Sequence, residues 1–112
     1  MASYRKQRIE NDIIRLINRT IINEIYDPVV KLGHVSHVKL SADFFHAVVY
    51  LDCYDRSQIQ TVVNAFKKAQ GVFSQMLAQN LYLAKSVKLH FVKDDAIDNA
   101  LKIEQIINSL KN

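Results

Sequence analysis

Four arginines near the beginning of the chain are spaced so that a helix would place them along one side. With 3.6 residues per turn they fall within about a quarter turn of one another. They are Arg5, Arg8, Arg15 and Arg19. The planar guanidinium group matches phosphate oxygens, so this ridge, with Lys6 beside it, could bind a nucleic-acid backbone. The alternative is a solvated helix face on which Asp12 pairs with one of the arginines.

A second basic group lies in a stretch without acidic residues. Between positions 61 and 93 the chain contains no Asp or Glu. The lysines in this stretch are Lys67, Lys68, Lys85, Lys88 and Lys93. Segregated charge of one sign is what a phosphate-facing surface requires. The distribution therefore indicates a polyanionic partner more strongly than the net charge of +4 does.

The sequence Ala69-Gln70-Gly71 follows Lys67 and Lys68 directly, within an apolar pattern of helical period. Glycine costs about 1 kcal/mol relative to alanine inside a helix, so Gly71 indicates either a kink or a close packing contact in one straight helix. A bend at Gly71 would expose N–H groups of the following half-helix beside two lysines, where an anion is favoured. Periodicity alone favours the straight helix, because the apolar pattern is not interrupted.

Residues 35–41, 46–54 and 87–91 alternate apolar and polar side chains, which is typical of strands with one buried face. The inward side chains would be Val38, Leu40, Ala47, Val49, Leu51 and Cys53. The opposite, solvated face would carry His37, Lys39, Tyr50, Lys88 and His90. A tyrosine there could stack on an unpaired base. Tyrosine and lysine are equally ordinary on an exposed strand face, so this surface is a third, weaker candidate.

Few residues could support catalysis or bind a metal. Strand alternation would turn His34 and His37 to opposite faces, and the single cysteine, Cys53, falls on the apolar face. The carboxylates at positions 94, 95 and 98 lie at a predicted helix start, where acids commonly cap the helix. We therefore predict that the protein is not an enzyme, holds no metal and needs no cofactor.

The candidate surfaces require helices and strands in a definite order. An apolar stripe of helical period predicts a first helix over residues 4–26, ended by Pro28. The capping-box pattern Ser57-x-x-Gln60 predicts the start of a second helix that extends to about residue 81. A last helix is expected over about residues 95–110. Because each element has one apolar face, helices should cover one face of a three-stranded sheet in an α+β fold.

The composition is that of a small globular protein. The chain has 112 residues, 49% of them hydrophobic, with only two glycines and one proline. We expect one domain over residues 1–112, with a core of about residues 4–93. One cysteine cannot form an internal disulfide, and no apolar run approaches the roughly 20 residues that span a bilayer. We therefore expect a cytoplasmic monomer.

Several short motifs, in this order and spacing, resemble the ribosome-binding factor A family. The motifs are Arg5-Lys6-Gln7-Arg8-Ile9, Glu24-Ile25 followed by Asp27-Pro28, Ser41-x-Asp43 followed by Ala47-x-x-Tyr50, and Ala69-Gln70-Gly71. The last stands where a standard KH domain has its GXXG loop. The resemblance implies a type II KH-like domain in the order helix, strand, strand, helix, Ala-x-Gly kink, helix, strand, with an added C-terminal helix. Val29 departs from the pattern, since many relatives have a basic residue after Asp-Pro.

The resemblance also implies a function: binding the RNA of the immature small ribosomal subunit during late maturation, without catalysis, a small-molecule substrate or a membrane. The expected contacts are the first-helix arginines and the lysines around Ala69-Gln70-Gly71. An alternative is a protein-interaction adaptor, in which the predicted last helix docks Ile97, Leu101 and Ile106 into a partner's groove.

Overall fold

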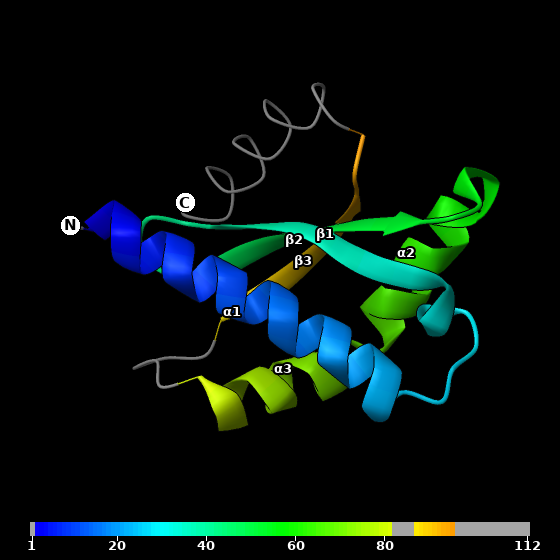
Figure 1. Cartoon of the computed structure of the whole chain (residues 1–112), viewed down its shortest axis with the longest axis horizontal. Helices are drawn as coiled ribbons and strands as arrows, with labels where there is room; N and C mark the ends of the chain where they lie inside the picture. Colours follow the sequence, from blue (N-terminus) through cyan, green and yellow to red (C-terminus); the bar gives the residue numbers. More distant parts are fainter. Residues whose placement is uncertain (1, 82–86, 96–112) are drawn as a thin grey trace.

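The computed structural model describes residues 2–81 and 87–95, and Figure 1 shows how the elements are arranged. The helices are α1 (Ala2–Asn23), α2 (Ile59–Lys68) and α3 (Gln70–Asn80), with short 3-10 turns η1 (Val30–Leu32) and η2 (Arg56–Gln58). The strands are β1 (Gly33–Leu40), β2 (His46–Cys53) and β3 (Lys88–Lys93). The order helix, strand, strand, helix, helix, strand confirms the predicted α+β, type II KH-like fold.

The sheet has the order β1-β2-β3, with β1 antiparallel and β3 parallel to the central strand β2. The described helices pack on one side of it, as Figure 1 shows for α1 and α3 below the strands. The α1 stripe of Ile9, Ile13, Leu16 and Ile17 is buried, as are Ala47, Val49, Leu51 and Cys53 of β2. Both predicted core faces are therefore confirmed.

Three phenylalanines join the two halves of the helical layer to the sheet. Phe66 of α2 stacks on Phe73 of α3 with ring centroids 5.4 Å apart. Both rings also contact Phe91 of β3, at 5.6 and 5.9 Å. Phe66 and Phe73 are fully buried, so this cluster fixes how α2 and α3 lie relative to each other.

Two helix boundaries differ from the sequence-based expectation. The helix α1 ends at Asn23, before the predicted residue 26. The Lys31 ammonium group donates to the carbonyl oxygens of Ile21 and Ile22, which lack helical partners at a helix end. The predicted capping box is wrong. The Asp55 carboxylate, rather than the Ser57 hydroxyl, provides the cap by accepting a hydrogen bond from the Ser57 N–H at 3.1 Å. The helix α2 begins only after η2.

A β-bulge in β1 changes which side chains share a face. The register shifts between Val35 and His37, so His34 lies opposite Asp52 and His37 opposite Tyr50. Asp52 and Tyr50 are two residues apart on one strand and point the same way, so His34 and His37 share the outer face. The expectation of opposite faces is wrong, because the extra residue reverses the alternation.

The alternation predicted a solvated outer face of the sheet, but this face is not uniformly exposed. Val48 is completely buried there, with the half-buried Tyr50 and Val92 packed against it. His37 and Lys88 are exposed, while Lys39 and His90 are half-buried.

Some predictions fall outside the described residues. These are Lys85, Asp98 and the body of the expected last helix, including Ile97, Leu101 and Ile106. Among the helices within residues 2–81 and 87–95, none combines the length and the apolar character needed to cross a membrane.

Candidate nucleic-acid interface

The four predicted arginines of α1 are all exposed, but they differ in their partners. The Arg15 guanidinium group pairs with the Asp12 carboxylate at 3.2 Å, the arrangement expected of an ordinary solvated face. Arg8 and Arg19 form no ion pair with any residue in the described ranges. The basic ridge is therefore reduced to these two cations, together with Arg5 and the half-buried Lys6.

Arg5 has an aromatic partner. Its guanidinium carbon lies 5.5 Å from the centroid of the Phe44 ring, within the range of a cation–π interaction. Phe44 is in the β1–β2 loop and packs on the hydrophobic core. The contact therefore joins the first turns of α1 to the hairpin, which sequence reasoning missed. The Ser41-x-Asp43 motif was the only signal near this site.

The loop around Phe44 is held by its own hydrogen bonds. The Asp43 carboxylate accepts from the Ser41 hydroxyl at 2.6 Å and from the Phe45 N–H at 3.0 Å. The Ser41 hydroxyl oxygen also accepts from the His46 N–H at 3.1 Å. Lys88 donates its backbone N–H to the Phe45 carbonyl at 2.7 Å, so the first residue of β3 lies beside this loop.

The helical layer breaks at Ala69, which separates α2 from α3 with φ −89° and ψ 8°. The expected kink is therefore present, but it lies at Ala69, two residues before Gly71. A Cβ atom built on Gly71 would meet no atom within 4 Å. The packing-contact alternative for Gly71 is wrong, since the residue faces open space in the first turn of α3.

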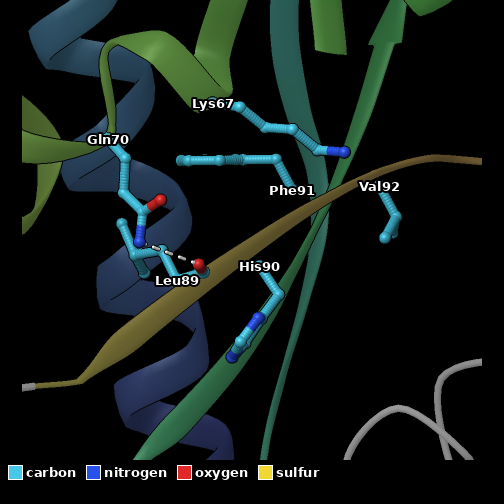
Figure 2. Close-up of a pocket in the computed structure, with 6 residues that line it drawn as sticks. All are labelled: Lys67, Gln70, Leu89, His90, Phe91 and Val92. Carbon is cyan, nitrogen blue, oxygen red and sulfur yellow. Dashed lines mark hydrogen bonds between the residues drawn. The ribbon is translucent and has the colours of Figure 1, made fainter. Parts of the chain in front are cut away.

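A cavity of about 330 Å³ opens between this break and the edge strand β3. Its lining is Lys67, Gln70, Leu89, His90, Phe91 and Val92. Figure 2 shows Lys67 and Gln70 extending from the helices toward β3, where the Gln70 amide donates to the Leu89 carbonyl at 3.2 Å. Lys68 is exposed in the last turn of α2. A cation and an amide from the Ala69-Gln70-Gly71 region thus lie at the open edge of the sheet.

The outer sheet face is occupied by contacts among its own side chains. His46 Nδ1 and His90 Nε2 are 3.1 Å apart. Burial lowers the pKa of His90, and the nearby His46 and Lys88 lower it further. The Tyr50 ring contacts His37 edge-on at 5.1 Å, and burial, with smaller effects of Asp94 and Glu10, raises the pKa of Tyr50. Tyr50 is therefore less suited to stacking on a base than an exposed ring would be.

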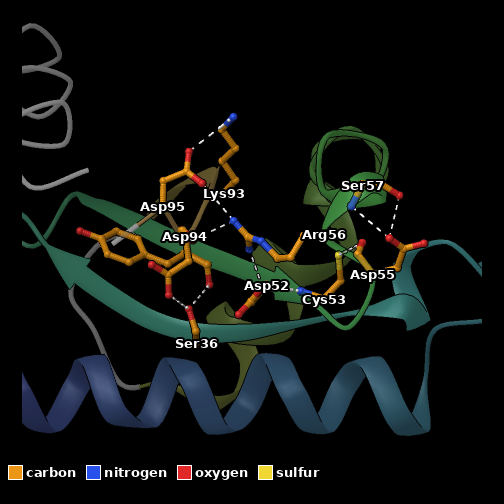
Figure 3. Close-up of polar contacts among 10 residues, drawn as sticks. Ser36, Asp52, Cys53, Asp55, Arg56, Ser57, Lys93, Asp94 and Asp95 are labelled. Carbon is orange, nitrogen blue, oxygen red and sulfur yellow. Dashed lines mark hydrogen bonds and ion pairs between the residues drawn. The ribbon is translucent and has the colours of Figure 1, made fainter. Parts of the chain in front are cut away.

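Sequence reasoning missed Arg56, which ties three parts of the fold together (Figure 3). Its guanidinium group bonds the Asp52 carboxylate, the Asp94 carbonyl at 3.1 Å and the Asp95 carboxylate at 3.0 Å. The hydrogen bond from Arg56 lowers the pKa of Asp52. The spacing of Asp52 and Arg56, four residues apart, was a weak signal, whereas nothing local links Arg56 to the end of β3.

One further carboxylate and the only thiol in Figure 3 also have partners within the fold. The Ser36 hydroxyl donates to the Asp94 carboxylate at 2.6 Å, so Asp94 joins β1 to the end of β3. The buried Cys53 thiol lies 3.1 Å from the Asp55 carbonyl, and burial raises the pKa of the thiol. In the described part of the chain, no three His, Cys, Asp or Glu residues are grouped so that they could hold a metal ion.

The candidate residues thus form two groups on the helical side and one on the far side of the sheet. The α1 ridge, meaning Arg5, Arg8 and Arg19 with Lys6 beside them, is one group, and Lys67, Lys68 and Gln70 at the helix break are the second. Lys39 and Tyr50 lie on the outer sheet face, opposite the face that the described helices cover. Lys88 adjoins both the outer face and the hairpin loop.

Comparison with known proteins identifies relatives for nearly the whole chain. The family model for ribosome-binding factor A matches residues 5–107. The ribosome-binding factor A of Mycoplasma pneumoniae is 70% identical over 111 residues, covering 99% of this chain and 96% of that protein.

Solved structures carry the same fold. The crystal structure of ribosome-binding factor A from Thermus thermophilus superposes with a TM-score of 0.73 at 23% identity, covering 81% of this chain and 97% of that one. A homology model of the Thermus thermophilus protein, fitted into a cryo-EM map of its complex with the 30S subunit, has a TM-score of 0.63 at 22% identity. It covers 76% of this chain and 90% of that one.

Proposed function

Because the chain belongs to the ribosome-binding factor A family, we propose that it binds the ribosomal RNA of the small ribosomal subunit and acts there as a non-enzymatic assembly factor. The Thermus thermophilus relative that was fitted into a 30S complex supports the choice of subunit. The site of action would be the cytoplasm, where the protein would bind as a monomer during late maturation of the subunit.

The observation that carries the proposal is the state of Arg8 and Arg19. Both are exposed on α1, and neither is neutralised by an acid within the described ranges. An arginine that the fold leaves uncompensated can replace the counterions of a phosphate backbone without breaking an internal ion pair. Such cations would position the protein on RNA by charge and shape rather than by sequence.

The helix break supplies a second contact region. Lys67 and Lys68 lie at the end of α2, and the cavity between Gln70 and β3 is open beside Lys67. Backbone phosphates would lie along these lysines. The protein would act by holding an immature RNA conformation, since none of its proposed contacts requires a bond to be made or broken.

The proposal is tested by measuring the affinity for immature small subunits at several salt concentrations. We expect the affinity to fall steeply as salt rises, because each phosphate contact adds roughly 0.7 to 0.9 to the slope of log affinity against log salt. An affinity independent of salt would reject the phosphate-contact mechanism. Mature small subunits serve as the matched comparison, and equal affinity for both would reject the role in maturation.

A further inference from the structure

We propose that Arg5 and Phe44 together form a stacking platform for one unpaired RNA base. The inference rests on the proposed function and adds to it the kind of nucleotide that this part of the surface binds. It comes from a contact between two elements far apart in the sequence, the first turns of α1 and the β1–β2 loop.

The Phe44 ring is held in place at a conformational cost. Phe44 has φ of 66°, a left-handed conformation that bulky residues rarely adopt. The loop maintains it through the Asp43 hydrogen bonds and through a bond from the Phe44 N–H to the Ser41 carbonyl at 3.1 Å. Such strain persists only where the surroundings impose it, and it is concentrated at ligand-binding sites. Here it orients an aromatic ring that is anchored on the core.

Arg5 covers this ring and remains exposed itself. Its guanidinium group is planar and lies over Phe44, and the residue forms no ion pair with the described residues. The Phe44 ring therefore lies on one side of the guanidinium group, while the exposed position leaves the rest of the group accessible. A base can stack on an arginine plane as it does on an aromatic side chain. The ring restricts the arginine, so less side-chain entropy is lost on binding.

Two further cations belong to segments next to the platform. Arg8 lies one turn further along α1, and the first residue of β3, Lys88, is bonded through its backbone to the Phe45 carbonyl. A stacked nucleotide has a phosphate on each side, and these cations could contact the two phosphates. The combination of a flat cationic plane with flanking point charges fits a nucleotide better than an acidic peptide, which would need only the charges.

The ligand is an unpaired base because a base inside a duplex has both faces stacked on its neighbours. Single-stranded loops and bulges present the free face that a platform needs. The probe is therefore an RNA hairpin with 2-aminopurine in its loop, whose fluorescence is quenched on stacking. A fully paired duplex of the same length and charge is the comparison.

Three variants of the full chain separate stacking from charge. Arg5→Lys keeps the charge but removes the plane, and Phe44→Asn removes the ring while tolerating the left-handed backbone. Arg15→Lys is the matched control, because Arg15 is an exposed arginine of the same helix that is paired with Asp12. Circular dichroism establishes that each variant is folded before binding is measured.

We expect the wild-type protein and Arg15→Lys to quench the loop fluorescence and to prefer the hairpin over the duplex. Arg5→Lys and Phe44→Asn should each lose the quenching and about tenfold in hairpin affinity, with the salt dependence of Arg5→Lys unchanged. Equal, salt-dependent binding of both RNAs without quenching would overturn the platform and leave the proposed function intact. Failure to bind either RNA or the small subunit would overturn both.

Discussion

Arg56 and the α1 ridge carry the same chemical group in opposite surroundings. Arg56 is exposed, but it bonds oxygen atoms of Asp52, Asp94 and Asp95, so the protein's own acids balance its charge. Arg8 and Arg19 have no such partner in the described part of the chain. The role of an arginine therefore follows from whether the fold supplies a counter-charge. The Arg56 cluster connects β2, η2 and the end of β3, whereas the ridge is left for a partner.

Reversing the charge of the ridge should give the largest effect. We expect Arg8→Glu combined with Arg19→Glu to lower the affinity for immature small subunits by about a hundredfold, since each lost charged hydrogen bond is worth roughly tenfold. The slope of log affinity against log salt should become shallower in the same titration. The melting temperature should change little, because both side chains are exposed. Unchanged affinity would remove the distinction between the two regions.

Removing the charge at Arg56 should affect the stability of the fold rather than the affinity for RNA. Arg56→Gln is expected to lower the melting temperature while changing RNA affinity by less than about twofold, because Arg56 makes no proposed phosphate contact. The hydrogen bond from Arg56 lowers the pKa of Asp52, so its stabilisation is present above the unfolded Asp pKa, near 3.8. It is lost as the pH falls through the lower folded value. Melting curves should therefore converge for wild type and variant in acid, and a parallel pH dependence would contradict this account.

A smaller effect concerns the helix break next to the basic residues. Gly71→Ala should stabilise the protein by about 0.5–1 kcal/mol in denaturant unfolding, because the new methyl group meets open space and alanine favours α3. The matched control is Gly33→Ala, whose Cβ would lie 2.5 Å from Val62 Cγ1 and should destabilise the fold. A loss of stability in Gly71→Ala would mean that the break needs glycine.

The smallest effect on stability is expected from the contact between His46 and His90. Burial and the neighbours His46 and Lys88 lower the pKa of His90 below 6.5. The unfolded chain therefore binds the proton more readily, and stability should decrease as the pH falls from about 6.5 through the lowered pKa. In His90→Gln this part of the pH dependence should disappear from the melting temperatures. The variant would disprove the assignment if it retained the full wild-type dependence.

The sequence predicted what depends on regular periodicity. The buried stripe of Ile13 and Ile17 and the inward face of β2 follow from repeats of 3.6 and 2 residues. The bulge beside Ser36 could not be predicted, because its extra residue leaves no trace in composition and only the pairing with β2 reveals it. Periodicity also gave no sign of the break at Ala69, because Phe66 and Phe73 both stay in the apolar phase across it.

The sequence indicated which types of residue could form the candidate site, but not which residues each of them contacts. Arg5, Arg8, Arg15 and Arg19 looked equivalent on a helical wheel, and only the fold separates the one that pairs with Asp12 from the others. The contact between Arg5 and Phe44 joins positions far apart in the sequence, as does that between Arg56 and Asp95. Such contacts depend on chain topology, which local spacing does not encode.

The stacked rings of Phe66, Phe73 and Phe91 bear on how RNA would be accommodated at the cavity. Because this aromatic cluster spans the junction of α2 and α3 from within the core, it fixes the positions of the two helices beside the cavity. A nucleotide entering there would meet a preformed shape and would not have to supply free energy to order it. The RNA conformations that bind there would then be those that already fit the arrangement of the two helices and β3.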